Sequence, residues 1–144
     1  MFSKACEYAI RATIYIAEQS RHNTKVSLKD VAKAIESPEA YTSKILQQLS
    51  RNNIINSSKG PTGGFSMDKQ KLNEVTLSTI VFAVDGDNIY NGCGLGLKEC
   101  NEKMPCPVHH QFKLIRNELK KMLETTAVTS LTVGLENKLT FLKR

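Results

Sequence analysis

The sequence lacks any apolar run approaching the roughly 18 residues that a membrane-spanning helix needs. Its opening segment, Met1 to Gln19, contains the charged residues Lys4, Glu7 and Arg11 and has no small-residue cleavage site, so it does not resemble a signal peptide. We therefore expect a soluble, cytoplasmic protein with no membrane partner. Hydrophobic residues make up 40% of the chain and charged residues 24%, which is typical of a folded protein.

The chain also lacks the motifs of catalysis. It contains no phosphate-binding loop, and no base accompanies a nucleophile beside a recognisable substrate pocket. We predict that the protein is not an enzyme. Cysteine is scarce but clustered, and in a reducing compartment clustered cysteines bind metal more often than they form disulfides.

Positive charge is concentrated in the first half of the chain. Residues 1–71 contain 11 Lys and Arg against 6 Asp and Glu, whereas residues 72–144 contain 9 against 8. The first half is therefore the better candidate for binding a polyanion such as DNA.

Apolar periodicity predicts two helices before Pro38. The first spans Ser3–Gln19 with Ser3 as its N-cap, and its apolar face includes Cys6, which we expect to be buried in the core. The second begins at Ser27, which forms a capping box with Asp30, and ends just before Pro38 because a residue that precedes proline avoids helical geometry.

A third helix is predicted from Pro38 to about Asn52, since proline suits the first turn of a helix. Ile45, Leu46 and Leu49 form its inner face. Its outer face carries polar side chains that can reach bases and phosphates: Tyr41, Thr42, Ser43, Lys44, Gln47 and Arg51. Two short helices with a tight turn between them indicate a helix-turn-helix, although an ordinary helical hairpin has the same pattern.

A β-hairpin wing is predicted directly after the third helix. Ile54–Ser58 and Phe65–Met67 have the character of short strands, and the segment Lys59–Gly64 between them is rich in turn residues. Glycines in the turn allow close approach of the backbone to a phosphate, and Lys59 adds positive charge. Lys59, Gly60 and Pro61 are therefore candidate DNA-binding residues.

The second half contains a short apolar helix, Thr76–Val84, followed by about twenty residues without periodicity. Such a loop in a compact chain is usually functional or disordered. It contains Cys93, Cys100 and Cys106, with glycines at positions 92, 94 and 96 around the first cysteine. A flexible backbone of this kind can wrap around an inorganic centre and donate amides to sulfur.

A long helix is predicted to begin at Pro107, directly after Cys106. His109 lies in its first turn and can supply a nitrogen ligand, whereas His110 points about 100° away. Apolar residues form a narrow coiled-coil seam: Val108, Phe112, Ile115, Leu119 and Met122. Charged residues are expected to cover the outside of this helix: Lys113, Arg116, Glu118, Lys120 and Lys121. The seam predicts pairing with a second copy of the chain, and packing against its own domain is the alternative.

These features predict a mainly α fold with a small β-hairpin: a winged helix-turn-helix plus a long dimerisation helix. We expect a DNA-binding domain in residues 1–75, a short helix and cysteine-rich cluster-binding loop in 76–106, and a dimerisation helix with a C-terminal segment in 107–144.

The chain resembles the IscR/NsrR-type transcription regulators, the Rrf2 family, over nearly its full length. The resemblance is carried by the Ser3–Ala17 and Tyr41–Asn52 helices, the Ser57–Pro61 segment with Gly63 and Gly64, the Ala83–Asp85 segment, and the three-cysteine loop. It implies a homodimer on double-stranded operator DNA, with the third helix of each subunit in the major groove and the wing near the minor groove. Residues matching positions that touch DNA in relatives are Tyr41, Ser43, Lys44 and Lys59. Relatives often carry Arg at the last of these, so lysine there favours phosphate or backbone contact over bidentate base reading.

The resemblance also implies that Cys93, Cys100 and Cys106 hold an iron-sulfur cluster, with 2Fe-2S favoured and 4Fe-4S possible. The fourth ligand differs among relatives. A histidine three residues after the last cysteine corresponds to His109, which we favour, and an acidic residue of the partner's first helix corresponds to Glu7 of the partner subunit. Gain, loss or oxidation of the cluster would then change the affinity for DNA.

Two alternatives keep the winged-helix regulator but change the sensor. Three cysteines and one histidine also form a complete zinc site, although structural zinc sites usually place cysteines in closer Cys-x-x-Cys pairs. A regulator without metal that senses thiol redox or another signal is the second alternative.

Overall fold

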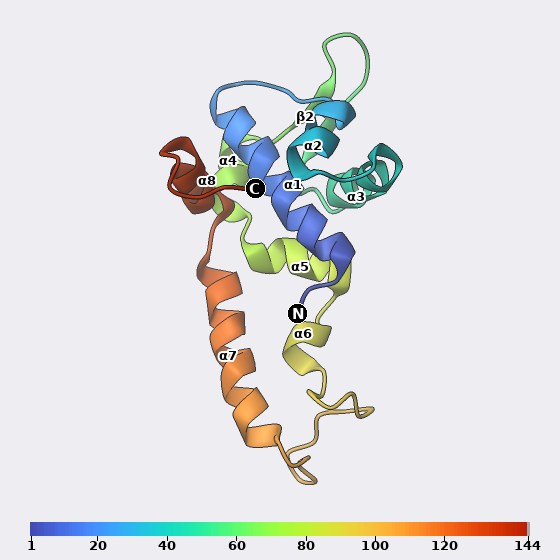
Figure 1. The fold of residues 1–144 in the computed structure, drawn as a ribbon, viewed down its shortest axis with the longest axis vertical. Coiled ribbons are helices and arrows are strands. Elements are labelled where there is room, and N and C mark those ends of the chain that lie inside the picture. Colours follow the sequence, from blue (N-terminus) through green and yellow to red (C-terminus); the bar gives the residue numbers. More distant parts are fainter. Residues whose placement is uncertain (144) are drawn as a thin grey trace.

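The computed structural model describes residues 1–143, so Arg144, at the end of the predicted 107–144 segment, lies outside the described residues. Over this range helices predominate, and the one sheet is the antiparallel pair of β1 (Asn56–Ser58) and β2 (Gly64–Ser66) (Figure 1). The predicted mainly α fold with a small β-hairpin is confirmed. None of the described helices is long and apolar enough to cross a membrane.

The first three helices are α1 (Lys4–Arg21), α2 (Leu28–Ile35) and α3 (Glu39–Arg51). The predicted caps are present: the Ser3 hydroxyl accepts from the Cys6 amide, and Ser27 and Asp30 form a reciprocal capping box. Helix α2 ends where Glu36 adopts a left-handed conformation with φ of 53°. Pro38 is the N-cap residue of α3, one position before the helix in which we predicted it.

The first strand of the wing is shorter than the sequence predicts, and the second has the predicted length but begins one residue earlier. Ile54 and Ile55 are buried in the core, so the first strand begins only at Asn56, and Ser57 pairs with Phe65 in the hairpin. Val26, in the segment before α2, pairs with Phe65 of β2: the amide of each residue donates to the carbonyl of the other, at 3.0 and 2.8 Å. The wing is thereby joined to the start of the helix-turn-helix.

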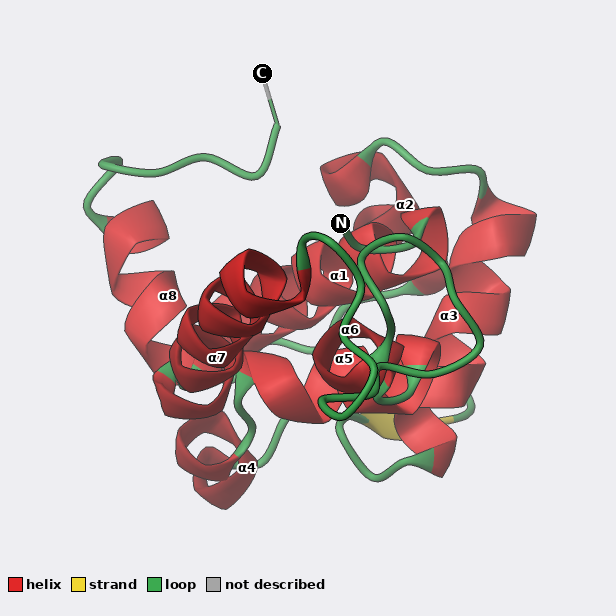
Figure 2. Ribbon diagram, turned by 90° about the horizontal axis from the view of Figure 1, so that it is seen from below, coloured by secondary structure: helices red, strands yellow, loops and turns green. Residues whose placement is uncertain are grey.

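The second half contains α4 (Lys69–Glu74), α5 (Leu77–Asp85), α6 (Asn88–Asn91), α7 (His109–Thr125) and α8 (Val128–Glu136). Residues 75–77 and 126–128 lie antiparallel, since the Leu77 amide donates to Thr126 (3.0 Å) and the Val128 amide donates to Val75 (2.9 Å). Residues 86–125 therefore leave the body of the molecule and return to it as a projecting arm, with α7 as its returning limb (Figure 1). Seen from below in Figure 2, α7 lies beside α5 and α6, with which it is in contact.

The main core is shared between the two halves of the chain. Ile16, Leu46 and Leu49 from the first helices are fully buried together with Ile80 of α5 and Val128 of α8. A second, smaller cluster joins Cys6, Val81 and Leu123 at the base of the arm. The predicted burial of Cys6 is confirmed, since none of its surface is exposed.

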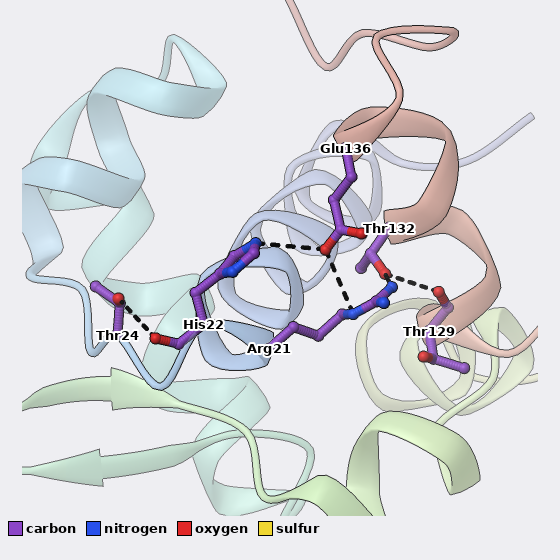
Figure 3. Close-up of polar contacts among 6 residues, drawn as sticks. All are labelled: Arg21, His22, Thr24, Thr129, Thr132 and Glu136. Carbon is purple, nitrogen blue, oxygen red and sulfur yellow. Dashed lines mark hydrogen bonds and ion pairs between the residues drawn. The ribbon is translucent and has the colours of Figure 1, made fainter.

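Helix α8 is also held to α1 by polar contacts, which Figure 3 shows. Arg21 donates from Nη1 to the hydroxyl of Thr132 at 2.6 Å, and its Nε lies 3.4 Å from Oε1 of Glu136. His22 Nε2 lies 3.4 Å from the same carboxylate oxygen. The chain after the arm is thus fixed against the first helix.

Candidate nucleic-acid surface and candidate metal centre

Helix α3 presents a polar face to solvent. Lys44, Gln47 and Arg51 are exposed, while Tyr41 and Ser43 are half-buried. These five side chains lie where the sequence placed them, on the side of α3 opposite its buried residues.

Thr42 is a correction to the predicted outer face. Its side chain is fully buried, and its hydroxyl donates to the Pro38 carbonyl at 3.0 Å. Four and seven residues on, Leu46 and Leu49 occupy the same side of the helix, so helical periodicity directs Thr42 inward with them. A hydroxyl that bonds back to its own helix tolerates this burial. Thr42 therefore leaves the set of residues able to touch DNA.

Tyr8 and Arg11 of α1 extend this surface and were not singled out in the sequence. The rings of Tyr8 and Tyr41 meet edge to face with centroids 5.7 Å apart, and Arg11 Cζ lies 5.6 Å from the centroid of Tyr8. The edge-to-face contact with Tyr8 positions the Tyr41 ring. The three-residue spacing of Tyr8 and Arg11, which puts both on one side of α1, was the sequence signal that could have identified them.

The turn of the wing is open to solvent. Lys59, Gly60 and Pro61 are all exposed, and Gly60 has φ of 93°, a backbone conformation that favours glycine. Lys25, also exposed, reaches across from the segment before α2, with Nζ 3.4 Å from the hydroxyl of Ser58. A second lysine therefore accompanies the wing, although it lies more than thirty positions from the hairpin turn in the sequence.

The segment 93–106, which contains the three clustered cysteines, forms the tip of the arm, at the opposite end of the molecule from the turn of the wing (Figure 1). All are half-buried and none forms a disulfide. Cys100 Sγ lies 3.3 Å from His109 Nδ1, so these two side chains form a close pair of candidate ligands. Between residues 1 and 143, no three Cys, His, Asp or Glu side chains converge closely enough to hold a metal ion.

His109 is nearly fully buried, with 3% of its surface exposed. Its Nδ1 faces Cys100, and its Nε2 has no hydrogen-bond partner within the described part of the chain. Buried polar atoms are almost always hydrogen-bonded, so an unpaired imidazole nitrogen calls for a functional explanation. A metal ligand is one such role for neutral histidine.

The start of α7 corrects the predicted helix boundary. Pro107 and Val108 form a turn in which the His109 amide donates to the Cys106 carbonyl at 3.0 Å, and the helix begins at His109 rather than at Pro107. Cys106 thus precedes the helix, and His109 is its first residue.

Backbone amides surround the sulfur of Cys93. The Leu95 amide donates to Cys93 Sγ at 3.4 Å, and hydrogen bonds from the amides of Leu95 and Leu97 lower the pKa of this thiol, with a smaller contribution from Cys106. The loop favours the thiolate of Cys93, which is the form that binds metal. Gly94 lets the loop lie against α7, because a Cβ at this position would be 2.7 Å from the Phe112 ring.

Two basic residues of α7 face the cysteine loop, so their expected position on the outside of the helix is wrong. Arg116 donates from Nη2 to Cys100 Sγ at 3.1 Å and from Nη1 to the Gly92 carbonyl. Lys113 forms an ion pair with Glu102. Arg116 lies four residues after Phe112 and so borders the apolar seam, and the loop packs against this side of α7 through Gly94 and Phe112.

Glu7, the alternative fourth ligand, lies at the start of α1. Its side chain is 44% exposed and forms an ion pair with Lys4 at 2.9 Å, and this hydrogen bond and charge lower the pKa of Glu7. Ligation by Glu7 of the partner subunit stays a prediction, because a single chain does not contain that contact.

The chain itself covers the predicted coiled-coil seam only in part: Leu119 packs on the small cluster at the base of the arm. Phe112, Ile115 and Met122 are 37%, 61% and 45% exposed, and Leu119 is half-buried. Phe82, on α5, is 65% exposed. Exposed apolar side chains in such a row are typical of a protein-protein contact.

Comparison with known proteins identifies the fold and the family. The family model described as "Rrf2: Iron-dependent Transcriptional regulator" matches residues 2–133. A putative HTH-type transcriptional regulator of Aquifex aeolicus is 28% identical over 140 residues, covering 96% of this chain and 94% of that protein.

Solved structures have the same fold at low sequence identity. CymR, the global cysteine regulator of B. subtilis, superposes with a TM-score of 0.74 at 20% identity, covering 92% of this chain and 96% of that one. IscR of T. potens gives a TM-score of 0.74 at 14% identity, covering 97% and 91% of the respective chains. At these identities the likeness shows the fold alone.

Proposed function

Because the chain belongs to the Rrf2 family of transcriptional regulators, we propose that it is a homodimeric repressor or activator whose affinity for operator DNA responds to an iron-sulfur cluster. The observation that carries the proposal is the composition of the arm tip. Three half-buried cysteines and a buried histidine with an unpaired nitrogen lie in this segment, at one end of a helix that returns to the DNA-binding body.

The residues present fit such a cluster. Cys93, Cys100 and Cys106 would supply sulfur and His109 nitrogen, and a 2Fe-2S cluster bound there would supply a centre able to change its oxidation state. Cys93 and Cys106 must draw together with the Cys100–His109 pair to act on one centre, since no three of these side chains converge now. Ligation would therefore reorder the loop.

The base of the arm is joined to the DNA-binding helices, which gives such reordering a route to DNA. Asp85, the last residue of α5, accepts hydrogen bonds from the Ser3 amide at 2.9 Å and from the Ser3 hydroxyl. Gln48 of α3 donates from Nε2 to the Ala83 carbonyl at 2.9 Å. A shift of α5 would therefore act on α1 and on the recognition helix, and cluster binding changes DNA affinity only if it favours one arrangement over the other.

DNA recognition would use the exposed face of α3 and the turn of the wing. The contacting residues would be Tyr41, Ser43, Lys44, Gln47, Lys59, Gly60 and Pro61. Pairing of two chains through the α7 seam would cover its apolar side chains and present two recognition helices to the two halves of an operator.

The decisive experiment is anaerobic purification followed by visible absorption spectroscopy, iron and sulfide assays, and DNA-binding measurements with and without the cluster. We expect coloured protein that contains iron and acid-labile sulfide, and an operator affinity that differs between the two forms. Cys100→Ser should lose the iron while retaining the fold. Colourless protein that contains only zinc would support the zinc alternative instead.

A second candidate is a metal-free regulator that senses thiol oxidation. It is favoured by the lowered pKa of Cys93, to which Cys106 contributes, because thiolates are the species that react with oxidants. Hydrogen peroxide treatment of metal-free protein, peptide mass mapping and DNA-binding assays would test it. A Cys93–Cys106 disulfide that changes DNA affinity supports this candidate, and unchanged affinity counts against it.

A further inference from the structure

We propose that Arg116 is a positioning residue of the cysteine site: it ties the start and the middle of the cysteine loop to α7 and places a positive charge beside a sulfur ligand. The loop-tying part concerns the metal-free chain, whereas the charge part rests on the proposed function. Neither the sequence pattern nor the family match pointed to this residue.

The contacts of Arg116 bridge two separate parts of the loop. One guanidinium nitrogen donates to the Gly92 carbonyl, just before Cys93, and the other donates to the sulfur of Cys100 at 3.1 Å. The planar guanidinium holds its donors in a fixed fork, which a lysine ammonium cannot reproduce. Arg116 therefore fixes where the start and the middle of the loop lie relative to α7.

The charge of Arg116 lacks the usual partner. In residues 1–143, no carboxylate lies within ion-pairing distance of its guanidinium, whereas Lys113 is neutralised by Glu102 and Lys120 lies 3.9 Å from Glu124. A half-buried cation is unfavourable without a compensating anion. The polar atoms within its reach are the sulfur of Cys100 and the Gly92 carbonyl, so the guanidinium is placed to stabilise negative charge on a sulfur ligand.

A positive donor at a sulfur ligand has a defined consequence for a cluster. Hydrogen bonds to sulfur and nearby charge are among the factors that set the reduction potential of iron-sulfur centres. Because reduction adds negative charge, the guanidinium favours the reduced form and should raise the potential. If Arg116 only held the loop in place, neutral substitutions and Arg116→Lys would have the same effect on the potential.

The first test uses metal-free protein and the loop's own cleavage sites. A glutamate-specific protease can cut after Glu99 and Glu102, both exposed, and substitutions at position 116 leave these sites unchanged. We expect Arg116→Met to accelerate cleavage roughly tenfold, the factor expected for losing a hydrogen bond to a charged group. Lys121→Gln removes another positive charge of α7 and is the matched control, with cleavage at the wild-type rate.

The second test measures the midpoint potential after reconstitution with ferrous iron and sulfide. Arg116→Met and Arg116→Gln should shift the potential to more negative values, by about 59 mV for each tenfold change in a one-electron equilibrium. Arg116→Lys keeps the charge and should recover most of the shift without restoring slow cleavage, and Lys121→Gln should leave the potential unchanged.

The outcomes separate the inference from the proposed function. Wild-type cleavage rates in Arg116→Met overturn the loop-tying role, and wild-type potentials in both neutral variants overturn the charge role. If the wild-type protein takes up no iron, the proposed function fails and the charge role fails with it, while the protease result still decides whether Arg116 orders the loop.

Discussion

Removal of the Gln48 side-chain amide should uncouple DNA affinity from the state of the arm. Gln48 is part of α3, and its Nε2 donates to the carbonyl of Ala83 in the last turn of α5 at 2.9 Å. The last carbonyls of a helix have no partner within the helix, so Gln48 satisfies an acceptor that is otherwise unpaired. Gln48→Met keeps a side chain of similar length but removes the donor.

The expected magnitude follows from this single contact. A neutral hydrogen bond contributes about 1 kcal/mol net, and a partly buried carbonyl left unpaired costs about 1–3 kcal/mol. We expect Gln48→Met to lower the free energy of unfolding by roughly 1 kcal/mol. If the contact transmits the state of the arm, the ratio of DNA affinities between cluster-loaded and metal-free protein should move about fivefold toward unity, since 1 kcal/mol corresponds to about that factor.

The assay is fluorescence anisotropy with labelled operator DNA at one fixed salt concentration, applied to both forms of each variant. Gln47→Met is the matched control, because Gln47 is the exposed neighbour on the same helix. It should weaken binding of both forms and leave their ratio unchanged. A wild-type ratio in Gln48→Met, with the protein folded, would refute coupling through this hydrogen bond.

Three further predictions concern the wing, the seam and the core. Lys59→Ala should weaken binding to every DNA sequence and reduce the slope of log K against log salt by about 1 in titrations at several salt concentrations. A loss of affinity that depends on the identity of one base pair would contradict a phosphate contact. Ile115→Glu should convert dimers to folded monomers in sedimentation and circular dichroism experiments, because it places charge in the exposed seam; an unchanged dimer would exclude the seam. Burial raises the pKa of Cys6 to about 12, with further contributions from Asp85 and Glu7. In the unfolded chain this thiol has a pKa of about 8.5 and loses its proton at lower pH than in the folded protein. The free energy of unfolding should therefore fall as the pH rises above about 8.5. Cys6→Ala should make urea unfolding less dependent on pH in this range, and an identical pH profile would contradict the assignment.

The sequence predicted the local structure of the first half well. Ser3 and the Ser27–Asp30 capping box mark helix starts by chemistry that acts within a few residues, and the apolar period of α3 gives its buried side. The error at Thr42 had the same local origin. Its residue type suggested exposure, whereas its position one turn before Leu46 required burial.

The cysteine site shows where sequence reasoning stops. Spacing indicated that Cys93, Cys100 and Cys106 belong to one loop with His109 at the start of the next helix, but a segment without periodicity carries no information on which side chains meet. The pairing of Cys100 with His109 and the inward direction of Arg116 depend on how the loop lies against α7. A charged residue on a helix was therefore assigned to solvent when its partner was the loop.

The order of elements, the helix caps, the wing and the clustered cysteines were determined by the sequence alone, because each depends on residues close together in the chain. Tertiary structure decided which distant segments are in contact. Val128 packs into the core formed by α1 and α3, Lys25 reaches Ser58 of the wing, and Gln48 donates to Ala83 at the base of the arm. A periodic pattern fixes which side of a helix is apolar or polar, but the partner of that side comes from a distant segment and is chosen only when the whole chain packs.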